Sequence, residues 1–163
     1  MTMVEIAVVL TIIAVLSTIF IATLTGGRAG DYIDRATQSI QNDVIFIRSR
    51  SVSTNRVHRV RFASTTEWVL EAYITGVAPP NDWEQVGDIR RMPTDTYLTD
   101  ATWSTSLANG TLMLEATPRG LFQMNGGGPA IPVPYIAITA LGSSKNKSIT
   151  VAVGGAVTID TNF

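Results

Sequence analysis

Hydrophobic and polar positions divide the chain into a long uncharged start and a more polar remainder. Residues 6–25 include no charged side chain, and as an α-helix this run of about 20 residues would be about 30 Å long. That length matches the hydrocarbon core of a bilayer, and no proline interrupts the run. A membrane-spanning helix fits better than a signal peptide, because no Lys or Arg precedes the run. It also fits better than a buried helix, which would need a larger domain around it.

A second helical pattern follows, with apolar residues at three-four spacing and polar residues between them. The expected inward positions are Ile33, Ala36, Ile40, Val44, Ile47 and Val52. This spacing predicts an amphipathic helix over residues 31–56 that lies on a sheet. Gly26, Gly27 and Gly30 separate the two patterns, and each weakens a helix by about 1 kcal/mol relative to alanine. We therefore expect the helix to be interrupted between residues 17 and 30, near Gly26 and Gly27.

From residue 57 onward the pattern changes to the alternation typical of strands. The first strand, residues 57–62, is expected to point Val57, Val60 and Phe62 inward, and a turn at 63–66 leads to a second strand at 67–74. Residues 76–95 are expected to form a proline-containing loop. Further strands are expected at 97–103, 111–116, 120–124, 135–141, 148–153 and 156–160.

One long helix followed only by strands predicts an α+β fold with an antiparallel sheet. We expect two parts. Residues 1–30 form an apolar segment that spans a membrane or lies in a filament core. Residues 31–163 form a globular head, made of the helix at 31–56 and the sheet at 57–163.

Composition sets limits on the function. The formal net charge is −1 and the isoelectric point is about 5.7. These values argue against a strongly basic surface for nucleic acid. The chain has no cysteine, which excludes a disulfide framework, a thiolate metal site and a cysteine nucleophile.

A single acid, Glu5, stands at the edge of the apolar run. An ionised carboxylate in lipid costs on the order of a few kcal/mol, so such groups usually have a partner. Two interpretations stay open. Glu5 is solvated at the level of the lipid headgroups, or it pairs with a cation such as the α-amine of Met1 on an adjacent, axially staggered subunit.

The opening residues Met1, Thr2, Met3, Val4 and Glu5, followed by the apolar run, resemble the mature N-terminus of type IV pilins and type II secretion pseudopilins. Phe is usual at the first position, and this chain has Met there. The resemblance implies cleavage before Met1 by a prepilin peptidase and N-methylation of the new amine. It also implies residence in the inner membrane, followed by assembly with inner-membrane machinery into an extracellular homopolymer. Glu5 would neutralise the amine of an adjacent subunit there, and the helix would lose helicity between residues 17 and 30 once in the filament.

The head also resembles a narrower group, the GspH/FimT-type pseudopilins and pilins. The similarity lies in residues 40–62, where an Arg-Ser-rich helix end leads into a Val-rich strand, and in the closing strands at 135–160. Many members of that group carry Arg directly after the glycine of the last turn. Here Ala156 follows Gly155, which puts in doubt a role in binding nucleic acid that depends on that basic turn.

Residues with catalytic or metal-binding chemistry are sparse. His58 is the only histidine, and no G-x-S-x-G motif is present, so we expect no enzymatic activity and no cofactor. Asp82, Glu84 and Asp88 share a predicted loop and could ligate calcium, but their spacing is not that of an EF-hand. A solvated or salt-bridged loop is the favoured interpretation.

Two further features concern the surface. Arginines concentrate at positions 48, 50, 56, 59 and 61, where they could bind phosphates or form ion pairs between subunits, and we favour the ion pairs. Asn109 and Asn146 begin N-glycosylation sequons in predicted turns.

The leading functional prediction is a structural subunit of a type IV pilus. The alternatives are a minor pseudopilin of a type II secretion system and a minor pilin that binds DNA or a surface ligand.

Overall fold

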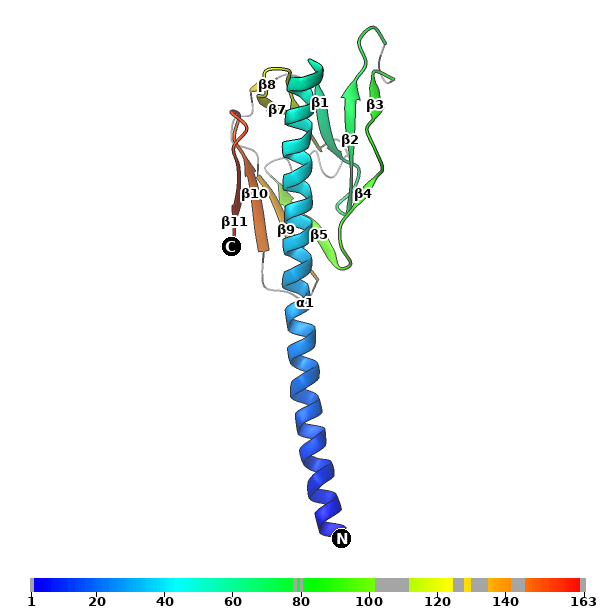
Figure 1. The fold of residues 1–163 in the computed structure, drawn as a ribbon, viewed down its shortest axis with the longest axis vertical. Helices are drawn as coiled ribbons and strands as arrows, with labels where there is room; N and C mark the ends of the chain where they lie inside the picture. The colour runs from blue at the N-terminus through cyan, green and yellow to red at the C-terminus, as the bar shows by residue number, and fades with distance from the viewer. Residues whose placement is uncertain are drawn as a thin grey trace.

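One helix runs the length of the molecule and carries the strands at its C-terminal end (Figure 1). The computed structural model describes residues 2–77, 79, 81–101, 112–124, 128–129, 135–141 and 146–161. Helix α1 spans Met3–Thr54, 52 residues that would measure about 78 Å. The helix begins after Thr2 and ends at Asn55, whose backbone is left-handed with φ +52°. Its N-terminal half extends away from the head as a bare rod.

The expected interruption near Gly26, Gly27 and Gly30 is absent, because α1 is continuous through all three residues. Each glycine weakens a helix by about 1 kcal/mol but removes no hydrogen bond, since every one keeps its N–H and C=O. The helix on both sides has already overcome the cost of nucleation, so the glycine segment continues the helical hydrogen-bond pattern. The loss of helicity that the pilin resemblance implies within a filament stays a prediction.

The strands form two antiparallel sheets rather than the one expected. Their bounds are β1 His58–Phe62, β2 Glu67–Tyr73, β3 Trp83–Gln85, β4 Arg90–Arg91, β5 Thr96–Ala101, β6 Leu112–Ala116, β7 Phe122–Met124, β8 Gly128–Pro129, β9 Tyr135–Ala140, β10 Asn146–Val151 and β11 Val157–Asp160. Among the described residues, sheet A has the order β3-β2-β1-β6-β7-β8, with β4 also pairing with β2. Sheet B has the order β11-β10-β9-β5. The α+β class is therefore confirmed.

Both sheets pack against the second half of α1 and share one hydrophobic core with it. The helix contributes Ala36, Ile40, Val44 and Ile47, as predicted, and all four are fully buried. Sheet A contributes Val60, Phe62, Trp68, Leu70, Leu114, Ala116 and Phe122, and sheet B contributes Leu98, Ile136, Ile138, Ile149 and Val151. The helix lies along the junction of the two sheets, in contact with β1 and β6 of one and with β5, β9, β10 and β11 of the other.

Two expected inward positions are instead taken by polar residues. Val52 is 55% exposed, and Ser51 is buried in its place. Val57 precedes the first strand and is only half-buried, whereas His58 begins β1 and is buried in register with Val60 and Phe62. In both cases we assigned the inward position to the apolar residue, whereas the polar residue next to it in the sequence lies on the buried face.

The predicted loop at 76–95 contains two short strands, β3 and β4, both paired with β2. They escaped the sequence pattern because a strand of two or three residues carries no alternation to detect. The hairpin of β1 and β2 is confirmed, with His58 opposite Ala72 and Phe62 opposite Trp68. Of the other predicted strands, each has a counterpart among β5, β6, β7, β9, β10 and β11.

Candidate functional site

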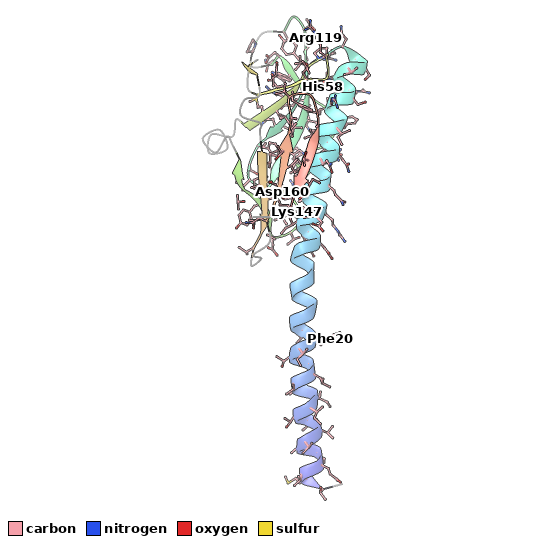
Figure 2. All side chains as sticks on the ribbon, turned by 90° about the vertical axis from the view of Figure 1, so that its left-hand side faces the viewer. Phe20, His58, Arg119, Lys147 and Asp160 are labelled. Carbon is pink, nitrogen blue, oxygen red and sulfur yellow. The ribbon has the colours of Figure 1, made fainter. Side chains whose placement is uncertain are left out.

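The first half of α1 is an apolar surface that the rest of the described chain leaves uncovered. By length and composition Met3–Ile21 could cross a membrane, and none of it is buried inside the molecule. Its large apolar side chains are 47% to 90% exposed, and Phe20 projects sideways from the bare helix in Figure 2. Thr11 and Thr18 donate their hydroxyl hydrogens to the carbonyls of Ala7 and Ala14, so these polar groups do not oppose burial in apolar surroundings.

Glu5 lies at the start of this surface and closes the first turn of the helix. Its Oε2 accepts a hydrogen bond from the backbone N–H of Thr2 at 2.7 Å, and the Thr2 hydroxyl accepts one from the N–H of Glu5 at 3.3 Å. This is a capping box, and an acid in the first turn also complements the helix dipole. The T-x-x-E spacing that encodes it was readable in the sequence and was missed there. One carboxylate oxygen of Glu5 therefore has a hydrogen-bond donor within its own chain.

Met1 lies outside the described residues, as does Asn109. The predicted pairing of Glu5 with the Met1 amine of another subunit is a contact between chains, and it stays a prediction. Gly26, Gly27 and Gly30 lie within continuous helix, between the apolar surface and the head.

Most of the arginines at positions 48, 50, 56, 59 and 61 form ion pairs or hydrogen bonds within the head. Arg59 and Arg61 both pair with Glu71 on the neighbouring strand, and Arg59 also stacks over the ring of Trp83 at 3.6 Å. Burial by itself raises the pKa of Glu71. Hydrogen bonds from Arg61 and Arg59, with their positive charges, outweigh it and bring that pKa below its usual value. The Arg56 guanidinium donates two hydrogen bonds to the carbonyl of Tyr73.

Arg48 holds the ends of both sheets to the helix. Its guanidinium donates to the carbonyls of Gly120 and Gly154 at 3.0 Å and of Gly155 at 3.3 Å. Gly120 lies in the turn between β6 and β7 of sheet A, and the other two lie in the turn between β10 and β11 of sheet B. Sequence reasoning missed this role because the acceptors are backbone carbonyls, which every residue type has. Arg50 stays exposed on the helix.

The single histidine forms a buried pair with a serine at the end of the helix. His58 Nδ1 lies 3.2 Å from Ser51 Oγ and 3.1 Å from the carbonyl of Arg56, and Figure 2 places His58 between α1 and the strands. A carbonyl can only accept, so Nδ1 carries the hydrogen and cannot act as a base toward the serine. The Ser51 hydroxyl donates to backbone carbonyls of Ile47 and Ala116. The pair is a structural contact between α1, β1 and β6.

Burial lowers the pKa of His58 below its usual value. The positive charges of Arg56 and Arg50 act in the same direction, and the hydrogen bond to the Arg56 carbonyl opposes them. His58 is therefore neutral near pH 7.

Two other candidate sites change once their places in the fold are known. In the part of the chain that is described, no three His, Asp or Glu side chains lie close enough together to hold a metal ion, and Asp82, Glu84 and Asp88 belong to that part. Asn146 lies in strand β10 rather than in the predicted turn, and its Oδ1 accepts a hydrogen bond from Thr139 at 2.6 Å. Ser148 of the same sequon is 2% exposed, which removes it from the surface.

Comparison with known proteins identifies the fold. No family model matches the chain, and no curated protein matches its sequence. Two structures of the minor pseudopilin EpsH from the type 2 secretion system of Vibrio cholerae are similar, with TM-scores of 0.56 and 0.55 at 10% identity. They cover 79% and 80% of this chain, and 96% and 97% of theirs. The type IV minor pilin FimU of Pseudomonas aeruginosa has a TM-score of 0.54 at 11% identity, covering 80% of this chain and 89% of its own.

These similarities bear out the resemblance read from the sequence at the level of fold. The chain shares the fold of the minor pseudopilin EpsH and the type IV minor pilin FimU. At 10% to 11% identity the likeness concerns the course of the backbone, so function has to be argued from this chain's own residues.

Proposed function

We propose that this protein is a structural subunit of a type IV pilus and catalyses no reaction. One observation carries the proposal: an exposed apolar segment, Met3–Ile21, long enough to cross a bilayer, opens a continuous helix and has a single acid at its edge. Such a surface has to be covered by lipid before assembly and by protein afterwards. The subunit therefore resides in the inner membrane and then in an extracellular filament.

Glu5 gives the assembly its register. Its Oε2 accepts a hydrogen bond from Thr2 within the chain. Among the described residues no donor to the other oxygen, Oε1, is seen, and this oxygen would accept from the α-amine of an adjacent subunit. The pairing removes a charge from apolar surroundings, whereas a subunit in a wrong axial position leaves that charge unpaired. The proposal includes processing at Met1 by a prepilin peptidase and methylation of the resulting amine.

The apolar segment does not by itself drive the subunit out of the membrane. Lipid tails are as apolar as the neighbouring helices, so the hydrophobic contribution changes little between the bilayer and the filament core. The direction of assembly has to come from an inner-membrane machine that consumes energy, which the pilin resemblance implies.

The test separates the charge of Glu5 from its capping hydrogen bond. Glu5→Ala removes both, whereas Glu5→Gln keeps an oxygen that can accept from the Thr2 N–H and removes only the charge. We expect both variants to be stable membrane proteins, and both to be absent from filaments sheared from the host cells and detected by immunoblotting. Filaments from Glu5→Gln at the wild-type level would limit Glu5 to capping and would overturn the pairing.

A second candidate function is a minor pseudopilin of a type II secretion system. It is favoured by the fact that the similar structures are of minor subunits, EpsH and FimU. Electron microscopy of sheared surface filaments, followed by mass spectrometry, distinguishes the two. If this chain is the dominant filament protein, the proposal of a pilus subunit is supported. If another chain dominates, this protein is a minor subunit instead.

A further inference from the structure

The most exposed large apolar residue of the described head lies at the end of the head nearest the apolar segment. This residue is Leu141, directly after β9, and it is 69% exposed, more than any other large apolar residue described beyond Ile21. Its backbone N–H donates to the carbonyl of Asp95 at 2.7 Å, in the turn that precedes β5. Leu141 is therefore held in place by its backbone, whereas its side chain is left in solvent.

Contacts with the helix show which end of the head Leu141 occupies. Near the start of β10, Lys147 pairs with Asp34, and after that strand the carbonyl of Gly154 binds Arg48, which lies further along α1. Strand β10 therefore runs in the same direction as α1, beside which it lies in Figure 1. The antiparallel β9 runs back toward the apolar segment. Leu141 follows the last residue of β9, so it lies at the end of the head that faces the apolar segment.

The height of Leu141 above the apolar segment follows from helix and strand geometry. Asp34 lies 13 residues beyond Ile21, the end of the candidate span, which is about 20 Å along the helix. In β9, Ile138 is the partner of Lys147, and Leu141 lies three residues closer to the span, which is about 10 Å along the strand. Leu141 is therefore about 10 Å beyond the level of Ile21.

That height is the level of the lipid headgroups when the apolar segment crosses a bilayer. The uncharged run continues past Ile21 to Thr25, about 6 Å further along the helix. The headgroup layer adds about 5–7 Å to each side of the hydrocarbon core. Transmembrane helices tilt by about 20° on average, and a tilt toward sheet B would lower Leu141 further. Leu141 can therefore reach lipid while α1 stays straight.

We propose that the head docks on the membrane surface before assembly, with the Leu141 side chain inserted into the headgroup layer of the bilayer that its own apolar segment spans. This inference rests on the membrane residence in the proposed function and adds a second lipid contact to it. A single leucine would not hold a free protein on a bilayer, but α1 keeps Leu141 beside the lipid, so the contact is intramolecular. The Leu141 N–H is already bonded to Asp95, so insertion leaves no unpaired backbone donor at this residue.

The charges at this end of the head indicate which lipids favour the contact. Asp31, Asp95 and Asp160 are exposed acids, Arg35 is an exposed base, and Lys147 pairs with Asp34. Figure 2 shows Asp160 and Lys147 at the same level of the head. Because acids outnumber bases among these side chains, anionic headgroups do not attract this end of the head. Apolar insertion has to carry the docking, and we expect it to be at least as strong on phosphatidylcholine as on mixtures with anionic phosphatidylglycerol.

The absence of cysteine permits a fluorescent probe at one chosen position of the full chain. Thr94→Cys places the probe in the exposed turn beside Leu141, so that residue 141 itself can be varied. The labelled chain is inserted into phosphatidylcholine vesicles in which some lipids carry a nitroxide quencher on the headgroup, and insertion is checked by flotation. We expect the probe to be quenched. Quenching should fall to background in Leu141→Asp, because a carboxylate stays in water, and should be retained in Leu141→Ile.

The background is set by a probe at Val77→Cys. Arg56, directly after the helix, donates to the carbonyl of Tyr73, so the turn that contains Val77 lies at the far end of the head. Val77 is also an exposed apolar residue, but a probe there should meet no nitroxide headgroup of the same bilayer. Leu141→Asp should keep the wild-type midpoint of urea unfolding in micelles, since the side chain that it replaces is exposed. A loss of quenching then reports docking and not unfolding.

The two proposals fail differently. If the chain does not float with the vesicles, the membrane residence in the proposed function fails, and the docking fails with it. If the chain floats but the probe at position 94 is quenched no more than the probe at position 77, the head does not dock, and the proposed function is unaffected. Quenching that is unchanged in Leu141→Asp would also overturn the docking through Leu141.

Discussion

At the scale of single residues, Gly155 leaves less room for a side chain than Gly76, Gly87, Gly120 or Gly154, because Arg48 lies against it. A Cβ atom added to Gly155 would lie 2.3 Å from the guanidinium carbon of Arg48, and the backbone there has φ +88°. The guanidinium can reach its three carbonyls only because the glycine has no side chain. Gly155 is therefore required twice, once for its conformation and once for the space.

We expect Gly155→Ala to lower the free energy of unfolding by roughly 2–4 kcal/mol, because left-handed strain adds to the loss of the hydrogen bonds that Arg48 donates to the turn carbonyls. Gly76→Ala is the matched control, since Gly76 has φ +85° and nothing within 4 Å of its would-be Cβ. It should cost only the strain, about 1–2 kcal/mol. Urea unfolding of the full chain in detergent micelles measures both. Equal losses would show that Arg48 moves aside without cost.

The residues at the candidate site differ in how far the sequence reveals them. Glu5 was identified because a lone acid in an apolar run is costly, and its capping partner Thr2 could be identified from spacing alone. Arg48 and His58 could not be assigned their contacts. Their partners are carbonyls of Gly120, Gly155 and Arg56, brought close by the fold from distant parts of the chain or supplied by a local turn.

At the scale of elements, periodicity was sufficient for the long helix and for most strands. It could not fix the continuity of the helix, because continuity depends on the balance between a small glycine cost and the support of flanking helix. It also could not assign strands to sheets. Strand β5 lies in sheet B, whereas the preceding β4 and the following β6 lie in sheet A, and no local signal marks that change.

The glycine region should be the least stable stretch of α1 although it is helical here. In hydrogen–deuterium exchange of the full chain in micelles, we expect amides of residues 24–30 to exchange faster than those of the buried helix at 33–47. Replacing both Gly26 and Gly27 with alanine adds about 2 kcal/mol of helix stability, which should slow that exchange roughly 30-fold. Ala29→Gly should accelerate it. Unchanged exchange in the double variant would contradict a helix weakened by its glycines.

At the scale of the whole molecule, two sheets share one helix and depend on polar contacts at the junction. Lys147 of β10 pairs with Asp34 at 2.6 Å, Asp43 accepts a hydrogen bond from the indole N–H of Trp68 in β2, and Figure 2 places Lys147 beside α1. The buried His58 joins α1 to sheet A. The pKa of His58 is shifted in the folded chain, so the stability of the head should depend on pH.

We expect the free energy of unfolding to be constant above about pH 6.5 and to fall as the pH decreases below it. The pKa of folded His58 is lowered from 6.5, so below that value the unfolded chain binds a proton that the folded chain does not. The loss for one such group is at most about 1.4 kcal/mol per pH unit. A second loss should begin below pH 4.5, since the pKa of folded Glu71 is also lowered from its usual value.

The two losses can be assigned with variants that keep the hydrogen bonds but do not titrate. In His58→Asn, the side-chain amide can still donate to the carbonyl of Arg56. Urea unfolding of this full-length variant should therefore show no decrease between about pH 7 and pH 5, where the wild type weakens. Glu71→Gln should be less stable than the wild type near pH 7, because Arg59 and Arg61 lose their shared carboxylate, and the two should converge as the pH falls below 4.5. If His58→Asn keeps the pH dependence of the wild type, the first loss of stability belongs to another group. The buried histidine would then take up its proton without unfolding the head.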